Sequence, residues 1–209
     1  MLHLGFVDER AEQKLAEGVW LHARLAGVAR TIVGVDSSGE GVEWARAQGY
    51  EAHVVDVQSQ ESVAAAGLEP AEVVVAGELI EHLDAPGPFL RALHPLVTRD
   101  GVLVLTTPNA YRLLNVLAPL TGAELVHGDH TGWQSPQTLR TLLGQSGWEI
   151  EDMAYYHAPV RAVPTRLRGR ERARAHLANA GRWALAAVNR PLPFWSEGIV
   201  VWARRDAAA

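Results

Sequence analysis

Acidic residues and a histidine stand directly after short hydrophobic runs of this sequence. Asp36 and Asp56 end two valine-rich runs, Glu78 follows a third, and Glu81 and His82 come shortly after it. A carboxylate in such a position accepts hydrogen bonds from both hydroxyls of a ribose, and histidine is the side chain best suited to accept a proton near neutral pH. The pattern therefore predicts a site that binds a nucleoside-like ligand beside a proton acceptor. The structural alternatives are a helix N-cap at Asp36, a turn cap at Asp56 and, for His82, a histidine packed at a helix start.

Two further histidines, His127 and His130, enclose the sequence HGDH. His130 is a candidate base or substrate contact, and the alternative is a polar surface loop with Trp133 packed beneath it. Two histidines three positions apart on a loop, with no evident set of further ligands, do not predict a metal site. We therefore expect no bound metal.

Short apolar runs alternate with helical patterns along most of the chain. The runs are nearly continuous in apolar character, as in strands buried on both faces of a parallel sheet. We predict strands at residues 1–5, 31–36, 52–57, 71–77, 101–109, 149–156 and 197–204. We predict helices at residues 10–29, 38–49, 59–66, 86–97, 135–148 and 170–189. This order indicates an α/β fold with a doubly wound, mostly parallel seven-stranded sheet and helices on both faces, which binds ligands beyond the carboxyl ends of its strands.

Residues 2–156 resemble the class I S-adenosylmethionine-dependent methyltransferases, particularly the small-molecule group, which have a Rossmann-like fold. The matching stretches are LHLG, IVGVDSS, VVDV, VVVAGELIEHLDAPGPFLRALHPLVTRDGVLVLTTPN and HTGWQSPQTLRTLLGQSGWEI, and the fourth keeps the order and spacing of that family. The resemblance implies S-adenosylmethionine as cofactor, bound by Gly5, Asp36, Ser37, Asp56, Val57, Gly77 and Glu78. It implies an acceptor pocket lined by Asn109, Tyr111, Arg112, His127 and Trp133. The catalytic candidates are Glu81, His82 and His130.

Two of the pocket residues have open roles. Arg112, if it faces the pocket, favours an anionic acceptor, because a guanidinium pairs with carboxylate and phosphate groups. For Asn109, capping of a following helix is an equally good interpretation.

The first loop departs from the family pattern. After Gly5 the family usually has glycines at every second position, whereas this chain has Val7 and Glu9. The distance from Gly5 to Asp36 is 31 positions, longer than a compact glycine turn and helix need. We therefore expect a longer first helix or an added turn around residues 18–27. The altered loop also leaves open an inactive binding or regulatory protein with this fold.

Composition excludes several classes of protein. The chain has no cysteine, which excludes disulfides, thiolate metal sites and cysteine nucleophiles and fits a reducing compartment. It has no signal-peptide pattern and no apolar stretch long enough to span a bilayer, so we expect a cytoplasmic protein. The net charge of −5 gives no general attraction to nucleic acid, and we expect no nucleic-acid partner.

A basic insert interrupts the expected fold. Residues 157–197 hold eight arginines, at positions 161, 166, 168, 170, 172, 174, 182 and 190, against two glutamates. We expect a cofactor-binding core at 1–156, this helical insert at 157–197, and the last core strand at 198–205. A basic amphipathic helix binds an anionic membrane surface or a phosphate-bearing substrate; the alternative is a solvated helix packed on the core or on a second subunit of a homodimer.

The sequence thus favours an enzyme that transfers a methyl group from S-adenosylmethionine to a small-molecule or lipid-like acceptor. The alternative is a catalytically inactive methyltransferase-fold binding or regulatory subunit.

Overall fold

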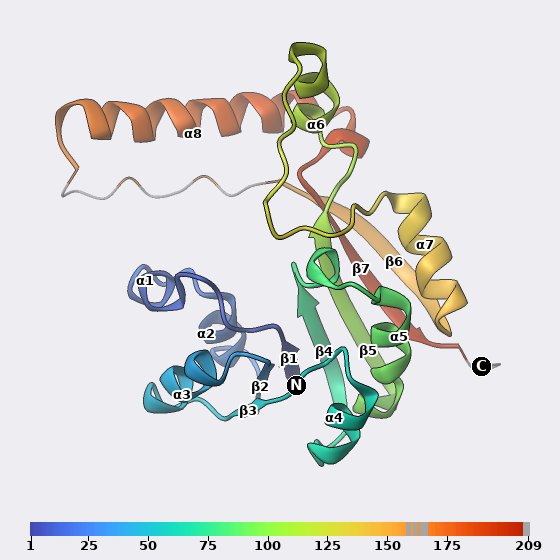
Figure 1. The fold of residues 1–209 in the computed structure, drawn as a ribbon. Coiled ribbons are helices and arrows are strands. Elements are labelled where there is room, and N and C mark those ends of the chain that lie inside the picture. Colours follow the sequence, from blue (N-terminus) through green and yellow to red (C-terminus); the bar gives the residue numbers. More distant parts are fainter. Residues whose placement is uncertain (158–159, 161–162, 164–166, 207–209) are drawn as a thin grey trace.

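The computed structural model describes residues 1–157, 160, 163 and 167–206. Within this part of the chain, seven strands form one sheet in the order β3-β2-β1-β4-β5-β7-β6 (Figure 1). The strands are β1 (Leu2–Leu4), β2 (Val33–Asp36), β3 (Ala52–Val54), β4 (Ala71–Gly77), β5 (Val97–Pro108), β6 (Trp148–Tyr156) and β7 (Gly198–Arg205). Strands β1 to β5 pair in parallel, and β7 runs antiparallel to both β5 and β6. This confirms the predicted α/β, Rossmann-like fold with a mostly parallel seven-stranded sheet.

Helices connect most of these strands. The α-helices are α1 (Ala11–Ala16), α2 (Leu21–Ala26), α3 (Gly39–Ala47), α4 (Gln60–Ala65), α5 (Pro86–Ala92), α6 (Leu113–Leu117), α7 (Pro136–Gln145) and α8 (Gly169–Asn189). Short 3₁₀ helices are η1 (Ile80–His82), η2 (His94–Leu96), η3 (Ala118–Thr121) and η4 (Pro193–Trp195). None of the helices in the described ranges is long and apolar enough to cross a membrane.

The buried side chains form two hydrophobic clusters. Leu2 and Leu4 of β1 belong to the larger cluster, which also contains buried residues of α4, α5 and α7. Phe6 and Trp20 belong to the smaller cluster, together with buried residues of α1 and α3. Side chains alternate between the two faces of a strand, and His3 of β1 contacts α2 rather than the larger cluster. The two clusters therefore indicate helices on both faces of the sheet.

Helix α7 begins with the cap that its sequence predicts. The Ser135 side chain accepts a hydrogen bond from the Thr138 N–H, the Thr138 hydroxyl accepts one from the Ser135 N–H, and Pro136 occupies the first turn. Gly147 follows the helix with a φ of +77°. This cap fixes the direction in which the chain enters the helix from the segment that carries His130.

Removal of this cap should destabilise the fold. We expect Ser135→Ala to lower the free energy of unfolding by about 1 kcal/mol, because the amide groups of the first turn lose their acceptor. Urea denaturation measures this, with Arg140→Ala on the exposed side of the same helix as the control. Equal midpoints for the two variants would show that the capping box contributes nothing to stability.

The single helix expected over 10–29 is wrong, because the structure has two short helices, α1 and α2, joined by a turn at 17–20. Gly18 in this turn has a φ of +68°, and the Val19 and Trp20 N–H groups both donate to the Lys14 carbonyl. Trp20 is fully buried, and its indole N–H donates to the Phe6 carbonyl at 3.0 Å. Burial of this side chain turns the chain inward, so the structure has the added turn that the long spacing indicated.

The expected helix 86–97 extends too far. Helix α5 ends at Ala92, and residues 94–96 form η2, because Pro95 lacks the N–H group that a continuing helix needs. Val97 already pairs with Ala71 of β4, so β5 begins four residues before the predicted start. Neither difference moves the carboxyl end of β5, where the site residues lie.

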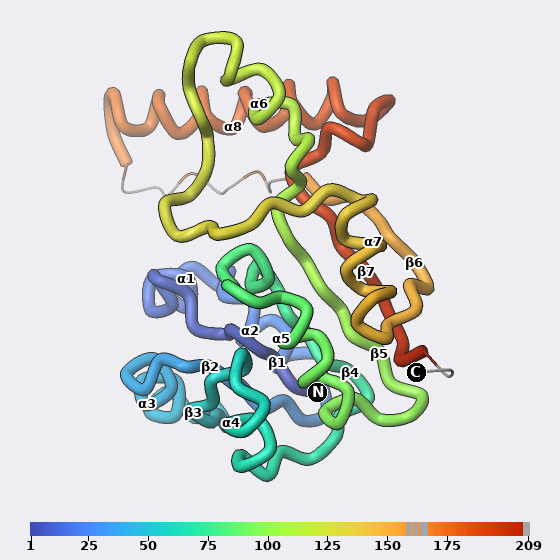
Figure 2. Tube along the Cα trace, turned by 45° about the vertical axis from the view of Figure 1, so that its right-hand side comes forward, coloured from blue at the N-terminus to red at the C-terminus, as the bar shows by residue number. Residues whose placement is uncertain are grey.

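Helix α8 forms most of the described part of the basic insert and confirms the helix predicted at 170–189. Figures 1 and 2 show it at one end of the molecule, together with α6 and apart from the helices that cover the sheet. Arg161 and Arg166 lie outside the described residues.

Candidate functional site

The carboxyl ends of β1, β2 and β4 lie side by side and form the predicted cofactor edge. Gly5 continues the pairing of β1 with β2, since its N–H donates to the Val35 carbonyl at 2.8 Å. It has a φ of +62°, and a Cβ added there would lie 2.9 Å from a Leu79 methyl group. Backbone conformation and space therefore both require glycine at this position.

Asp36 lies at the end of β2 and is half-buried. One carboxylate oxygen accepts the Val7 N–H and the other accepts the Ser38 N–H, each at 2.9 Å. Ser38 is the N-cap of α3, because its hydroxyl accepts the Gly41 N–H, so Asp36 does not serve as that cap. A carboxylate has about four acceptor positions, so the two that these amides use leave capacity for a ligand.

Phe6 and Val7 explain why the first loop needs fewer glycines than expected. A Cβ at Gly34 would meet the Phe6 ring at 2.8 Å, and one at Gly41 would meet a Val7 methyl group. The two apolar side chains thus fit onto glycines of β2 and α3. This packing fixes the first loop against β2 and α3. It also places the Val7 N–H where Asp36 accepts its hydrogen bond.

His3 of β1 is a buried histidine two positions before Gly5. It packs against His22 of α2, with the two Nδ1 atoms 3.2 Å apart, and both side chains are buried. Burial lowers the pKa of His3 to about 3, aided by His22, and burial lowers that of His22 to about 4. At neutral pH the pair is uncharged and belongs to the core beneath the cofactor edge.

The other predicted cofactor contacts occupy different environments. Ser37 is exposed. Asp56 is exposed at the turn after β3, where its carboxylate accepts the Gln58 N–H at 2.9 Å. Val57 is 8% exposed and packs in the larger cluster. Gly77 ends β4, and a Cβ there would lie 3.4 Å from a methyl group of Leu21. Their contacts with a cofactor stay predictions.

Glu78 has an unusual backbone conformation at the end of β4. Its φ of +50° makes it the one non-glycine residue with positive φ in the described part of the chain. Such strain persists only where the surroundings hold it, and it is typical of functional sites. The carboxylate accepts hydrogen bonds from the Thr106 hydroxyl at 2.9 Å and from the Tyr156 hydroxyl at 2.5 Å.

Tyr156 is a site residue that sequence reasoning missed. It ends β6, and its ring crosses β7 over Gly198, where a Cβ would lie 2.1 Å from the ring. Burial and the neighbouring Glu78 carboxylate raise the pKa of Tyr156, so the phenol stays protonated and donates to Glu78. The contact could not be predicted from a local sequence pattern, because Glu78 and Tyr156 are 78 positions apart in the chain.

We expect Gly198→Ala to displace the Tyr156 ring and destabilise the protein by about 1–3 kcal/mol, because the new Cβ overlaps a packed side chain. Thermal or urea unfolding measures the change. Gly144→Ala is the matched control, since a Cβ at Gly144 in α7 meets nothing within 4 Å and alanine favours helix. A Gly198→Ala variant as stable as the Gly144→Ala variant would contradict the packing of Tyr156 across β7.

Glu81 is the most buried carboxylate of the site, with 2% of its surface exposed. One oxygen accepts the Thr107 hydroxyl at 3.0 Å, and the other is buried without a hydrogen-bond partner among the described residues. Burial, with a smaller effect of the nearby Glu78 carboxylate, raises the pKa of Glu81 to about 7. Glu81 therefore exchanges a proton near neutral pH.

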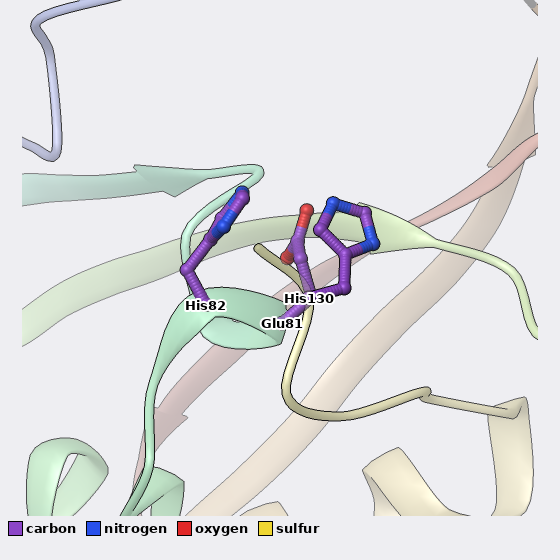
Figure 3. Close-up of side chains that lie close together, drawn as sticks. All are labelled: Glu81, His82 and His130. Carbon is purple, nitrogen blue, oxygen red and sulfur yellow. The ribbon is translucent and has the colours of Figure 1, made fainter. Parts of the chain in front are cut away.

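Three histidines gather beside Glu81. Figure 3 shows the side chains of Glu81, His82 and His130 close together. The His130 ring centroid lies 4.7 Å from that of His82 and 5.5 Å from that of His127. Burial and then repulsion from these two histidines lower the pKa of His130. His130 is therefore a neutral imidazole near pH 7, able to accept a proton.

Hydrogen bonds hold the His130 segment against η1. The Glu81 carbonyl accepts the Thr131 N–H at 2.9 Å, and the Thr131 hydroxyl donates to the Leu83 carbonyl at 3.0 Å. Nδ1 of His82 lies 3.2 Å from the Asp129 carbonyl. These contacts explain why Glu81 and His130, which are 49 positions apart in the sequence, lie close together.

The same cluster has the composition of a metal site. Glu81, His82 and His130 each offer one ligand atom, and these atoms lie within 4.8 Å of one another. Glu9, His127 and Asp129 form a second such group, in which all three residues are exposed. Imidazole and carboxylate together suit several divalent cations. The expectation of a metal-free protein was based on two histidines alone, and it stays a prediction.

A cavity of about 410 Å³ opens beside Glu81 and His130. Its lining residues are Glu81, Pro108, Asn109, Ala110, Arg112, Asn115, Leu125, Val126, His127, His130, Gly132 and Trp133. A second cavity of similar volume shares Asn115, Leu125 and Trp133 with it. Four of the five predicted acceptor residues therefore lie at one cavity. The fifth, Tyr111, is not in the lining and stacks on Phe194 at 5.2 Å.

Asn109 and Arg112 also have structural partners. The Asn109 amide is fully buried, donates to the Phe194 and Ser196 carbonyls and accepts the Tyr111 N–H. Arg112 donates to the side chain of Asn115 and the carbonyl of Leu125, and it pairs with Glu197 at 3.4 Å. Both residues hold the cavity wall in place, and the Arg112 charge is partly compensated before any acceptor binds.

This sheet, with an acidic residue ending β2 and an acceptor-sized cavity beyond β4 and β5, defines an S-adenosylmethionine-dependent methyltransferase fold of class I. Magnesium protoporphyrin IX methyltransferase from Synechocystis, solved with bound S-adenosylhomocysteine, shares it with a TM-score of 0.59 at 14% identity, over 98% of this chain and 73% of that one. The methyltransferase domain family matches residues 16–152, and the chain belongs to this family.

Curated relatives carry a more specific description. Ubiquinone biosynthesis O-methyltransferase from Azorhizobium caulinodans is 32% identical over 148 residues, which is 66% of this chain and 57% of the relative. The protein of the same description from Thiobacillus denitrificans is 30% identical over 169 residues, or 73% of this chain and 72% of the relative. The chain thus spans little more than half of the first relative.

Proposed function

We propose that this protein transfers a methyl group from S-adenosylmethionine to a hydroxyl group of a small-molecule or lipid-like acceptor. The observation that carries the proposal is the pair of proton acceptors, Glu81 and His130, at a cavity that adjoins the cofactor edge. A hydroxyl acceptor needs such a group, because it loses its proton when its oxygen is methylated. Relatives described as O-methyltransferases agree with this choice.

The residues at the strand ends fit the cofactor. Asp36 is accessible and keeps acceptor capacity for ribose hydroxyls, Gly5 places no side chain at its own position in the first loop, and Glu78 offers a carboxylate near the positively charged ligand. S-adenosylmethionine, when bound, supplies an electrophilic methyl group on a sulfonium. The chain contributes the cavity that orients the acceptor and the groups that receive its proton.

Two side chains, His130 and Glu81, are the acceptors for the proton that the acceptor hydroxyl loses. His130 is uncharged near pH 7 and lines the cavity, so it accepts a proton directly from a bound hydroxyl. Glu81, with a pKa of about 7 and a carboxylate oxygen free of hydrogen bonds among the described residues, lies in the same wall. Trp133, which is 40% exposed, offers an apolar surface to an aromatic acceptor.

Calorimetric titration with S-adenosylmethionine and S-adenosylhomocysteine tests the cofactor half of the proposal. Incubation with labelled S-adenosylmethionine and catechol-type, phenolic and amine acceptors tests the other half. We expect binding in the micromolar range and label transfer to hydroxyl compounds. Transfer to amines alone would overturn the choice of oxygen. Absence of cofactor binding by the folded protein would favour the alternative, an inactive binding or regulatory subunit.

Several features of the assembly belong to the same proposal. The helices on both faces support a doubly wound core formed by residues 1–156 and 198–205, with 157–197 as an insert. A homodimer and a cytoplasmic location remain predictions from the sequence.

A further inference from the structure

Among the elements that the structure describes, η4 is the one that helix α8 contacts most. Its inward side consists of half-buried residues at three- and four-residue spacing, and Asn189 is its one buried residue. These inward residues are Ala175, Asn179, Arg182, Ala186 and Asn189, and Leu185 beside them is half-buried as well. The helix packs against η4 and otherwise extends from the end of the molecule (Figures 1 and 2). It lies beyond the part of the chain that matches the methyltransferase family, so the cofactor fold does not explain it.

The outward side of α8 is mainly apolar. At 3.6 residues per turn, the residues opposite the inward side are Arg170 in the first turn and then Ala173, Leu177, Ala180, Ala184 and Val188. Leu177 is 74% exposed, Val188 is 47% exposed, and Trp183 at the edge of this side is 65% exposed. A helix in water normally presents polar residues to solvent. Helix α8 instead presents mainly apolar residues on its outward side, which indicates that another surface covers this side.

Arginines stand on both flanks of the apolar side. In the helical projection Arg172 and Arg190 lie along one flank and Arg174 lies along the other, while Arg170 lies in line with Val188 in the first turn; all four are exposed. Between Arg168 and Arg190 the chain has six arginines and one acidic residue, Glu171. None of these arginines forms an ion pair with a carboxylate among the residues that the structure describes. The helix therefore carries a large uncompensated positive charge around an apolar centre.

We propose that α8 lies flat on an anionic membrane surface. Its apolar side enters the boundary between headgroups and acyl chains, the flanking guanidinium groups pair with lipid phosphates, and Trp183 occupies the interface. A second copy is a poorer occupant, because α8 against α8 would bring two arginine-rich flanks together. The proposal does not rest on methyl transfer and stands or falls separately from it.

Vesicle sedimentation with the full chain tests the proposal, using phosphatidylcholine vesicles with and without about 30% phosphatidylglycerol. The charge variant is Arg170→Gln/Arg172→Gln/Arg174→Gln, and the apolar variant is Leu177→Ser/Trp183→Ser. Glutamine favours helix nearly as well as arginine, so the charge variant keeps α8 folded. The matched controls are Arg30→Gln and Val28→Ser, since both side chains are highly exposed and far from α8 in the sequence.

We expect the protein to bind only the anionic vesicles and to release them at high salt. Each α8 variant should bind at least about tenfold more weakly, while the controls bind as the unchanged protein does. Cofactor affinity should be the same in all variants. Equal binding to both kinds of vesicle, no binding, or full binding by the charge variant would overturn the proposal. So would a dimer in lipid-free solution that Leu177→Ser/Trp183→Ser converts to monomer, since a second copy would then cover the helix.

Discussion

Replacement of Asp36 by asparagine should weaken S-adenosylhomocysteine binding by about 10²–10³-fold. The carboxylate would accept both ribose hydroxyls, and hydrogen bonds to a charged group each contribute about 1.5–3 kcal/mol. An asparagine amide offers one acceptor oxygen, which the Val7 or Ser38 N–H would occupy. Calorimetric titration measures the loss, with Asp56→Asn as a second carboxylate variant at the same edge.

Asp36 also holds the first loop through Val7, so a weaker affinity alone would not identify the contact with the ribose. The 2′-deoxy analogue of S-adenosylhomocysteine resolves the two roles. We expect the unchanged protein to prefer the ribose form and Asp36→Asn to bind both forms equally. If Asp36→Asn weakened both ligands by the same factor, Asp36 would act only through the loop.

The second large effect concerns Glu81. We expect Glu81→Gln to lower the rate of methyl transfer by about 10²–10⁴-fold if the carboxylate takes the proton of the acceptor. In the unchanged protein the rate should rise with pH through about 7, because Glu81 accepts a proton only in its charged form. Loss of His130 should leave this inflection in place, since the pKa of His130 is lowered and the group is already uncharged below pH 7.

Thr107→Val separates proton transfer from a structural role of Glu81. The Thr107 hydroxyl stabilises the charged carboxylate, so its removal should raise the pKa of Glu81 further and move the inflection above pH 7. Valine has nearly the shape of threonine, so the buried site stays filled. An inflection unchanged in Thr107→Val would exclude Glu81 as the titrating group.

Glu81 also makes stability depend on pH, with a sign that follows from its raised pKa. Between about pH 4.5 and pH 7 the folded state binds more protons at Glu81 than the unfolded state does, so stability falls as pH rises through this range. The loss amounts to about 3 kcal/mol. Glu81→Gln removes this slope, and it should be more stable than the unchanged protein at pH 8. Urea unfolding at pH 5 and pH 8 measures both effects.

Predictions from sequence were best where a residue's position depends on its neighbours in the chain. Ser135 and Pro136 predicted the start of α7, and the short apolar runs, four of them rich in valine, predicted the seven strands of the described chain. The sequence left open a longer first helix or an added turn around residues 18–27. The structure has the turn between α1 and α2, because Trp20 is buried beside Phe6. Propensity could not reveal that contact.

The sequence by itself determined which acidic residues end the strands, and therefore that Asp36, Glu78 and Glu81 lie near one edge of the sheet. The periodicity of side chains specifies the strands, and parallel pairing then brings their carboxyl ends together. Only the tertiary structure decided how each carboxylate behaves. Tyr156 reaches Glu78 across β7, and the segment of His130 covers Glu81 and removes it from water. Burial and charge at a site come from residues distant in the chain, and these set the pKa values on which the proposed chemistry depends.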